Sequence, residues 1–400
     1  MNTLRGAVYT LLVLLSAPTL GGEWDWHADA ELELRAFSDT PKWPGQSDKS
    51  VHSAIALSGE LYWLSESGDQ RAALVPYLRH DAIDEERNLV DLKQAYWAME
   101  YGSGALDLLI GVDKVFWGVA ESTHLVDIVN QTDAVADIDG EQKLGQLMLK
   151  LSWQEDWGLL SVFALPMFRE RNFAGTEGRL RAGAVIDSDY AQYEHAAEDR
   201  HLDWALRYSH YFGDLDLGLS AFKGTLRDPL LLPNADGSVL VPHYQQVDQV
   251  GIDAQYTRNA WLWKLEAVWR SSSLDNYIAA VAGFEYTHFG LFDSAADLGY
   301  LLEYQYDNRH DTEPPSIADN DVFIALRLAL NDVQDSSVLT GLLIDIESDA
   351  VLFNVEAERR FGSNTVGKLR LRVIEAPQED LILYSLQHDS YLQVSLQRYF

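Results

Sequence analysis

Apolar and polar residues alternate at every second position in many segments of this chain, each roughly 9–14 residues long. In one such segment Trp263 and Leu265 alternate with Lys264 and Glu266. The same pattern is found at 30–36, 55–63, 202–208, 214–219, 297–306 and 368–373. An amphipathic helix would instead place its apolar residues three or four positions apart. The alternation therefore predicts an all-β chain whose strands each have one apolar and one polar face.

The connections between these strands alternate in length. Short polar or glycine-containing turns are predicted at 66–70, 102–104, 154–156, 257–259, 331–335, 362–364 and around Gly213, with a looser one at 289–294. Longer connections are predicted at 38–50, 116–143, 169–200, 226–244, 308–320 and 375–388, with two shorter ones on the same side at 271–275 and 347–350. This regularity is typical of a transmembrane, antiparallel, up-and-down β-barrel.

We count eighteen strands, with sixteen as the rival count. One ambiguity lies between residues 71 and 101, where Asp91 and Lys93 would share a strand face with Trp97 and Met99. A β-bulge would place the two pairs on opposite faces. No domain linker interrupts the pattern, so residues 23–400 are expected to form one barrel domain.

Aromatic residues near the predicted strand ends fit a membrane barrel, whose interfacial girdles are rich in them. They are Trp63, Trp97, Trp153, Trp157, Trp261, Trp269, Tyr304 and Phe400. The alternative is a soluble β-sandwich with these side chains in its core, although one sandwich rarely needs so many long strands.

The last predicted strand, at 391–400, has one apolar face and finishes on Phe400. It resembles the C-terminal strand of Gram-negative outer-membrane barrels, which typically ends in Phe and is bound by the barrel-assembly machinery. That resemblance implies the same machinery as a partner here, although Arg398 departs from the apolar residue preferred at its position. Closure without a free edge in lipid requires this strand to pair with the first one, around 28–37.

Residues 1–22 have the features of a secretory signal peptide: Arg5, an apolar run at 7–15 and small residues after it. We expect cleavage near Gly21 or Gly22. No later segment has the ~18 consecutive apolar residues of a membrane helix. The chain has no cysteine, which excludes disulfides, a lipid-modified cysteine and cysteine-based zinc sites.

The net charge of -32 argues against nucleic acid as a partner. A soluble acidic protein would distribute this charge over its surface. A barrel would carry it in the lumen and the outer loops, where it favours the passage of cations. We therefore predict a pore that prefers cations.

The connection after the predicted strand at 106–112 holds the densest group of candidate site residues. In known porins the third extracellular loop folds into the barrel and narrows it, and this segment is apolar enough to do the same. It resembles an uncharacterised family of proteobacterial outer-membrane barrels in which Trp-Gly-x-x-Glu is followed by Asp-x-x-Asn-x-x-Asp. The matching residues are Trp117, Gly118, Glu121, Asp127, Asn130 and Asp133. The family pattern has Asn-Pro before its final Asp, whereas Gln131 follows Asn130 here.

The resemblance implies that these loop residues form a pore constriction. The alternative is that they cap and hydrogen-bond a folded loop without contacting any solute.

Five basic residues are expected on the facing wall: Lys368, Arg370 and Arg372 on one strand, and Arg327 and Arg360 on neighbouring strands. Adjacent like charges are costly unless water or acids compensate them, and Glu356 and Glu358 are the candidate partners. Such a basic ladder opposite an acidic loop would set a transverse field in a water-filled pore. The alternative is a salt-bridged wall that fills the lumen and conducts nothing.

Motifs for enzymatic chemistry were sought and are few. The chain has no Gly-x-Ser-x-Gly elbow, His-Glu-x-x-His zinc motif or glycine-rich phosphate loop. His195, Glu198, Asp199 and His201 could bind a metal but fit a solvated loop better. Residues 137–141 have part of a calcium-loop pattern without its full ligand spacing. We expect no catalytic residues, no metal and no cofactor.

The sequence thus predicts an integral barrel of the Gram-negative outer membrane, in contact with lipid and lipopolysaccharide. The predicted function is a porin-like channel for passive diffusion of small hydrophilic solutes, either monomeric or trimeric. One alternative is a non-conducting structural or export barrel that sheathes a partner or a surface polymer. The other is an outer-membrane hydrolase, in which His124, His195 or His201 would be the residues to substitute.

Overall fold

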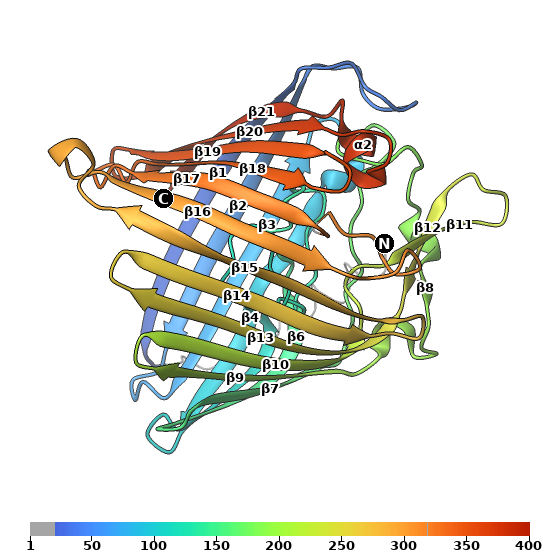
Figure 1. The fold of residues 1–400 in the computed structure, drawn as a ribbon. Coiled ribbons are helices and arrows are strands. Elements are labelled where there is room, and N and C mark those ends of the chain that lie inside the picture. Colours follow the sequence, from blue (N-terminus) through green and yellow to red (C-terminus); the bar gives the residue numbers. More distant parts are fainter. Residues whose placement is uncertain (1–20, 318) are drawn as a thin grey trace.

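The structure, a computed structural model, describes residues 21–317 and 319–400. Eighteen antiparallel strands of this part form one closed sheet (Figure 1). The strands are β1 (Glu23–Phe37), β2 (Val51–Leu64), β3 (Gln70–Asp81), β4 (Leu89–Tyr101), β5 (Leu106–Asp113), β6 (Gln146–Glu155), β7 (Gly158–Leu165), β9 (Asp203–Phe212), β10 (Leu215–Thr225), β13 (Gln246–Arg258), β14 (Trp261–Ser271), β15 (Asn276–His288), β16 (Asp297–Asp307), β17 (Asp321–Ala329), β18 (Ser337–Asp345), β19 (Val351–Phe361), β20 (Thr365–Glu375) and β21 (Tyr391–Tyr399). The predicted count of eighteen is confirmed. The predicted signal peptide lies almost wholly outside the described residues.

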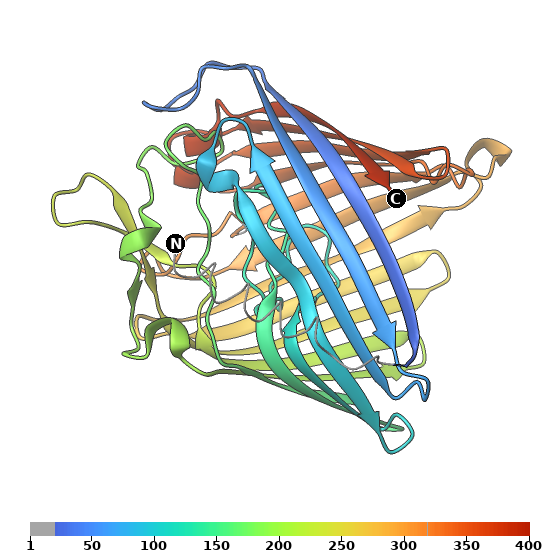
Figure 2. The same cartoon turned by 180° about the vertical axis from the view of Figure 1, so that it is seen from behind.

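The barrel closes between its first and last strands. β1 pairs with β2 on one side and with β21 on the other, from Asp29 opposite Tyr399 to Phe37 opposite Tyr391. Figure 2 shows this seam from outside, with the end of β21 alongside β1. The predicted pairing of the two terminal strands is therefore confirmed, and each of the eighteen strands of this sheet has a partner on both edges.

The alternation in sequence becomes an apolar outer face and a polar inner face. On β14, Trp263 and Leu265 are 47% and 38% exposed, whereas Lys264 and Glu266 are 8% and 0% exposed. Successive side chains of a strand point to opposite sides of the sheet, so this pattern places the charged residues in the lumen. No helix in the described part of the chain is long and apolar enough to cross a membrane.

A β-bulge lies where the parity of side chains was ambiguous. Pro76 pairs with Leu92 and Val75 pairs with Gln94, so Lys93 is the extra residue on β4. The bulge directs Lys93 into the lumen, while Trp97 pairs with the exposed Ile110. The predicted bulge is confirmed.

Aromatic side chains gather near both ends of the outer wall. Trp153, Trp157 and Trp261 lie at the short-turn end, Trp269 and Tyr304 lie nearer the long-loop end, and all five are 39–45% exposed. Trp63 also lies at the short-turn end, one residue before the end of β2, where it is 5% exposed and its ring lies 6.3 Å from that of Trp24.

The long connections lie at one end of the barrel and fold over its mouth. They contain a small sheet of β8 (Gln192–Tyr193), β11 (Leu230–Pro233) and β12 (Leu240–Tyr244), and the helix α2 (Leu381–Leu386). They also contain the short 3-10 helices η1 (Glu85–Arg87), η2 (Ser188–Tyr190) and η3 (Glu198–Arg200), while η4 (Leu291–Asp293) lies in a turn at the other end. The connection at 82–88, which carries η1, is missing from the predicted set. An ion pair between Arg179 and Asp389 joins two of the long connections.

Candidate functional site

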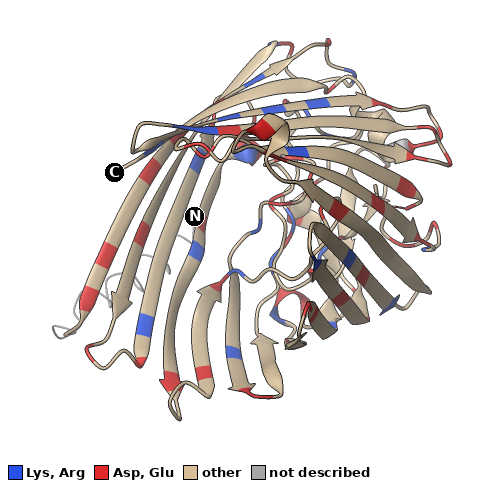
Figure 3. Ribbon diagram, turned by 60° about the vertical axis from the view of Figure 1, so that its left-hand side comes forward, with Lys and Arg blue, Asp and Glu red and all other residues tan. Residues whose placement is uncertain are grey.

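The connection between β5 and β6, residues 114–145, runs into the barrel and is called the inner loop here (Figure 3). Its central part is apolar. Val126 and Val129 are fully buried and belong to one cluster with Phe163 of β7, Phe222 of β10 and Val268 of β14. Burial of this apolar surface holds the inner loop against the wall from β5 to β15. The predicted folding of this loop into the lumen is confirmed.

Two buried glutamates of the wall bind the main chain of the inner loop. Oε1 of Glu266, on β14, accepts hydrogen bonds from the backbone N–H groups of Val119 at 2.7 Å and Ala120 at 2.9 Å. Glu303, on β16, accepts from the backbone N–H of Glu121 at 2.9 and 3.1 Å. The two glutamates are 0% and 1% exposed. Donors from the inner loop therefore replace the water that these carboxylates lose on burial.

The Trp-Gly pair of the sequence motif explains how the loop comes so close. Gly118 has a φ of +133°, and a Cβ at this position would lie 2.7 Å from Oε1 of Glu266. Trp117 is buried, with its ring edge-on to Phe163 at 5.6 Å and the guanidinium of Arg207 5.4 Å from its centroid. Trp117 thus anchors the loop to the wall, and Gly118 lets the backbone reach the carboxylate.

On its other flank the inner loop binds β20 through ion pairs. Asp137 lies 2.5 Å from Arg370 and 3.2 Å from Arg372. Asp139 lies 2.9 Å from Arg372, and Glu356 of β19 lies 2.6 Å from the same guanidinium. Two neighbouring arginines therefore share three carboxylates, which compensates the like charges on β20. Glu356 is one of the two partners that the sequence indicated.

The middle of the inner loop is fixed by further arginines. Asp133 makes a bidentate ion pair with Arg79 of β3, with contacts of 2.7 and 3.1 Å, and both residues are buried. Arg35 of β1 donates to the backbone carbonyl of Ala136 at 2.8 Å. Planar guanidinium groups suit such bidentate contacts, so they fix position as well as charge.

Two motif residues hold the loop to itself. Asp127 lies 3.3 Å from Lys143 across the loop. The side-chain amide of Asn130 donates to the backbone carbonyls of Asp113 at 3.0 Å and Leu144 at 2.9 Å, which joins the two ends of the loop. These contacts correspond to the alternative in which motif residues shape the loop rather than contact a solute.

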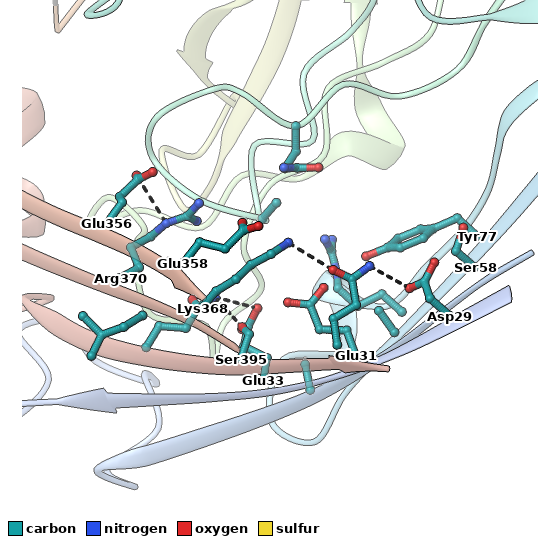
Figure 4. Close-up of a pocket in the computed structure, with 18 of the residues that line it drawn as sticks. Asp29, Glu31, Glu33, Ser58, Tyr77, Glu356, Glu358, Lys368, Arg370 and Ser395 are labelled. Atoms are coloured by element: carbon teal, nitrogen blue, oxygen red, sulfur yellow. Dashed lines mark hydrogen bonds and ion pairs between the residues drawn. The ribbon is translucent and has the colours of Figure 1, made fainter. Parts of the chain in front are cut away.

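A cavity of about 800 Å³ remains between the inner loop and the opposite wall (Figure 4), and it is called the lumen cavity here. It is lined by strands β1–β4 and β17–β21 and by a few residues of the inner loop. Its acidic lining residues are Asp29, Glu31, Glu33, Glu60, Glu121, Glu356 and Glu358, and its basic ones are Arg79, Arg87, Lys93, Lys114, Arg327, Lys368 and Arg370. Seven acids and seven bases balance, so the excess of acid in the whole chain is not repeated at this cavity.

Four of the ten residues singled out in the sequence line the lumen cavity: Glu121, Arg327, Lys368 and Arg370. Glu121 joins loop to wall, with Arg327 at 2.6 Å and Lys264 at 3.6 Å. The other six are Trp117, Asp127, Asn130 and Asp133 in the inner loop, and Arg360 and Arg372 on the wall. Arg372 is buried against its acidic partners, while Arg360 lies beside the turn at 330–336, 3.2 Å from Asp335. Arg360 therefore does not face the inner loop as the ladder hypothesis required.

Burial and charge shift the pKa values of several loop groups. Burial lowers the pKa of His124, but the carboxylates of Glu141, 2.9 Å away, and Glu266, 4.0 Å away, outweigh burial and raise it to about 10. Burial would raise the pKa of Glu141, and His124 brings it below its ordinary value. Both pKa shifts reflect the attraction between a protonated His124 and an ionised Glu141. Burial, together with the neighbouring Asp137, raises the pKa of Asp139 to about 6.

Several residues of the loop–wall contact were not singled out from the sequence, among them Glu266, Glu303, Arg35 and Arg79. Their inward orientation follows from alternation, but their partners are more than fifty residues away along the chain. One signal was available. Glu266 and Glu303 are acidic residues on the inner face of long strands, and such buried charges need donors from elsewhere in the fold.

In the described part of the chain, no group of three or more His, Cys, Asp or Glu residues is arranged to hold a metal ion. The rings of His195 and His201 lie 4.4 Å apart, and His201 is hydrogen-bonded to Asp203 at 2.7 Å. Asp137 and Asp139, in the segment that resembled a calcium loop, are bound by arginines instead.

No protein-family model matches the chain, and no curated protein sequence matches it. Solved structures do match. OpdQ of Pseudomonas aeruginosa has a TM-score of 0.53 at 12% identity, over 94% of this chain and 96% of that one. Wzi of Escherichia coli, an outer-membrane, carbohydrate-binding β-barrel involved in group 1 capsule assembly, has a TM-score of 0.51 at 12% identity, over 93% and 84%. OprB of Pseudomonas putida has a TM-score of 0.45 at 13% identity, over 99% and 97%. The likeness concerns the fold, which is that of outer-membrane, porin-like β-barrels.

Proposed function

We propose that this barrel is a porin-like channel of the Gram-negative outer membrane for passive diffusion of small hydrophilic solutes. The observation that carries the proposal is the asymmetric position of the inner loop. Its apolar part packs on the wall from β5 to β15, and a polar lumen cavity of about 800 Å³ remains along the other wall. Solutes would pass along β1–β4 and β17–β21, with the short turns on the periplasmic side and the long loops outside.

The charges around this path suggest weak ion selectivity. Lining acids and bases balance at seven each, so a preference for cations, as expected from the net charge of -32, would have to arise outside the lumen cavity. The ion pairs between the inner loop and β20 act chiefly to hold the loop in place. The ion pair between Glu121 and Arg327 lies where the inner loop borders the lumen cavity.

Planar-bilayer recording of the refolded full chain tests the proposal. We expect steady conductance steps and a reversal potential in a salt gradient that shows cations favoured by at most a few-fold. Preference for anions would overturn the selectivity, and silence at all voltages would overturn the channel itself. Liposome swelling with sugars of increasing size would then give the size limit.

A second candidate is a non-conducting barrel that sheathes or binds a partner, as the alternative from the sequence suggests. Ties among the long connections support it, because Arg179 is bound to Asp389 and Asp84 accepts a hydrogen bond from the backbone of Gly175. Wzi, which shares the fold, binds carbohydrate. Silent bilayers together with binding of a surface polysaccharide would favour this candidate. An outer-membrane hydrolase stays the second alternative to the channel, and lipase and protease assays on the refolded protein would test it.

The proposed partners follow from location. The exposed apolar outer wall would contact lipid and lipopolysaccharide, and the terminal strand ending in Phe400 would be bound by the barrel-assembly machinery during insertion. Trimerisation is a further proposal, which cross-linking in native membranes would test.

A further inference from the structure

The basic residues that line the lumen cavity fall into two groups. Its four arginines are all in ion pairs: Arg79 with Asp133, Arg87 with Asp81 and Glu33, Arg327 with Glu121, and Arg370 with Asp137. Its three lysines, Lys93, Lys114 and Lys368, form no ion pair with another described residue. Arginines thus fix the inner loop, whereas lysine charges stay available to a solute.

One of these lysines is linked to an acid through a single amide. Nζ of Lys368, on β20, donates to Oε1 of Gln397 at 3.1 Å, and Nε2 of Gln397 donates to Oδ2 of Asp29 at 3.0 Å. Figure 4 shows this chain of contacts running from Lys368 to Asp29, with Glu31 beside it. Like Lys368, neither Asp29 nor Glu31 forms an ion pair with another described residue. Gln397 therefore lies between opposite charges that no salt bridge neutralises.

The spacing of the two charges is given by their contacts with the Gln397 amide. Lys368 pairs with Ser395 on β21, and Ser395 pairs with Glu33 on β1, so Asp29 lies four residues along β1 from the residue that is opposite Lys368. The contacts of 3.1 and 3.0 Å with this amide place Nζ of Lys368 and Oδ2 of Asp29 at most roughly 8 Å apart, given standard amide bond lengths. Between them β21 presents uncharged hydrogen-bonding side chains to the lumen cavity, namely Gln393, Ser395 and Gln397.

We propose that this part of the lumen cavity is a subsite for small zwitterions, that is, solutes with one ammonium and one carboxylate group. The ammonium binds Asp29 and Glu31, the carboxylate binds Lys368, and the solute takes the place of the Gln397 amide as the bridge. A span of roughly 8 Å accommodates two charge-assisted hydrogen bonds of about 2.8 Å and the charged groups of a short molecule between them. This inference rests on the proposed channel function and names the solute class that the channel favours.

The rest of the lining argues for a zwitterion rather than a singly charged ion or a sugar. A lining with seven acids and seven bases gives no net attraction to either sign of charge. Tyr62 and Tyr77 are the aromatic residues of the lining, and the ring of Tyr77 is covered by Lys93 at 3.7 Å. Stacking surfaces for sugar rings are therefore few, while separated charges of both signs are present.

The test compares β-alanine, a zwitterion, with its uncharged isomer lactamide in proteoliposomes that contain the full chain. We expect flux of β-alanine that is faster and saturable, and flux of lactamide that is slower and linear with concentration. Lys368→Met and Asp29→Asn should each reduce the preference for β-alanine by about tenfold, the effect expected for one charge-assisted hydrogen bond. Lys368→Arg should restore most of it.

Lys223→Met is the matched control, since Lys223 is paired with Asp248 and exposed outside the lumen cavity. Heat-modifiable mobility in gels would verify that each variant is folded. Equal, unsaturable flux of both isomers, or an equal effect of Lys223→Met, would overturn the subsite while leaving the channel intact. If neither isomer passes, the channel function fails, and saturation-transfer NMR with β-alanine in detergent micelles decides the subsite by itself. Binding lost in Lys368→Met supports it, and absence of binding to the unaltered chain overturns it.

Discussion

The carboxylate of Glu303 on β16 accepts two contacts, at 2.9 and 3.1 Å, from the backbone N–H of Glu121 in the inner loop. A side chain of the barrel wall thereby holds the main chain of the loop, and the side chain of Glu121 is left to contact Arg327 at the edge of the lumen cavity. The position of the loop edge is therefore set by the wall.

Removing the charge at this contact should loosen the loop without disturbing the barrel. For Glu303→Gln we expect the amides of Glu121 and Ser122, which donate to Glu303, to lose about 1.5–3 kcal/mol of protection, the range for hydrogen bonds to a charged group. Hydrogen exchange of these amides and open-channel current noise would measure it. Glu155→Gln, at an exposed turn, is the control. Unchanged exchange at 121 and 122 would contradict the role of Glu303.

Substitution of Arg372, on β20, should destabilise the protein much more than substitution of Arg360, which lies near the turn at 330–336. Arg372→Met leaves Asp137 and Asp139 buried with less compensation, so we expect a loss of about 3–5 kcal/mol in the free energy of unfolding. Arg360→Met removes a half-exposed pair with Asp335 and should cost about 0–1 kcal/mol. Urea unfolding in detergent would compare them. Similar losses in both variants would show that the buried pairs do not hold the loop.

The charged pair between His124 and Glu141 should weaken at high pH. Its pKa is raised from 6.5 to about 10 in the folded protein. The stabilisation is therefore complete below about pH 6.5 and is lost as the pH rises toward 10. Fluorescence of Trp117 and NMR titration of the imidazole would follow this change, with His124→Gln as the reference that lacks it. An imidazole that titrates near pH 6.5 would contradict the charged pair with Glu141.

The terminal residue should matter for assembly. The backbone N–H of Phe400 donates to the carbonyl of Ala28 at 2.9 Å, and its side chain is 66% exposed. If the barrel-assembly machinery recognises this end, Phe400→Ala should lower the folded fraction in outer membranes several-fold. Gel mobility of membrane fractions would show it. Phe292→Ala, in which another exposed aromatic is removed from a turn, should have no effect.

The strand pattern was open to prediction because the side-chain period of a strand is a local property. Alternation placed Lys264 and Glu266 inside and Trp263 outside, and it located the bulge that brings Lys93 into the lumen. It also placed Arg370 and Arg372 on the inner face.

The contacts of the inner loop were beyond the sequence. Asp127 and Asn130 were candidates for a constriction, yet they tie the loop to itself, and Trp117 packs on the wall. Nothing local distinguishes an acid that meets a solute from one that meets an arginine two hundred residues away.

By itself the sequence determined the closed all-β barrel, its eighteen strands and the sign of each inward charge. Alternation of side-chain direction along a strand and short turns between strands both depend only on residues that are close together in the sequence. Only the tertiary structure decided which of those charges form ion pairs within the protein. Loop and wall meet across long chain separations, so which partner each charge finds depends on the folded lumen. There the arginines bind the inner loop, while Lys368 and Asp29 are linked only through the side-chain amide of Gln397.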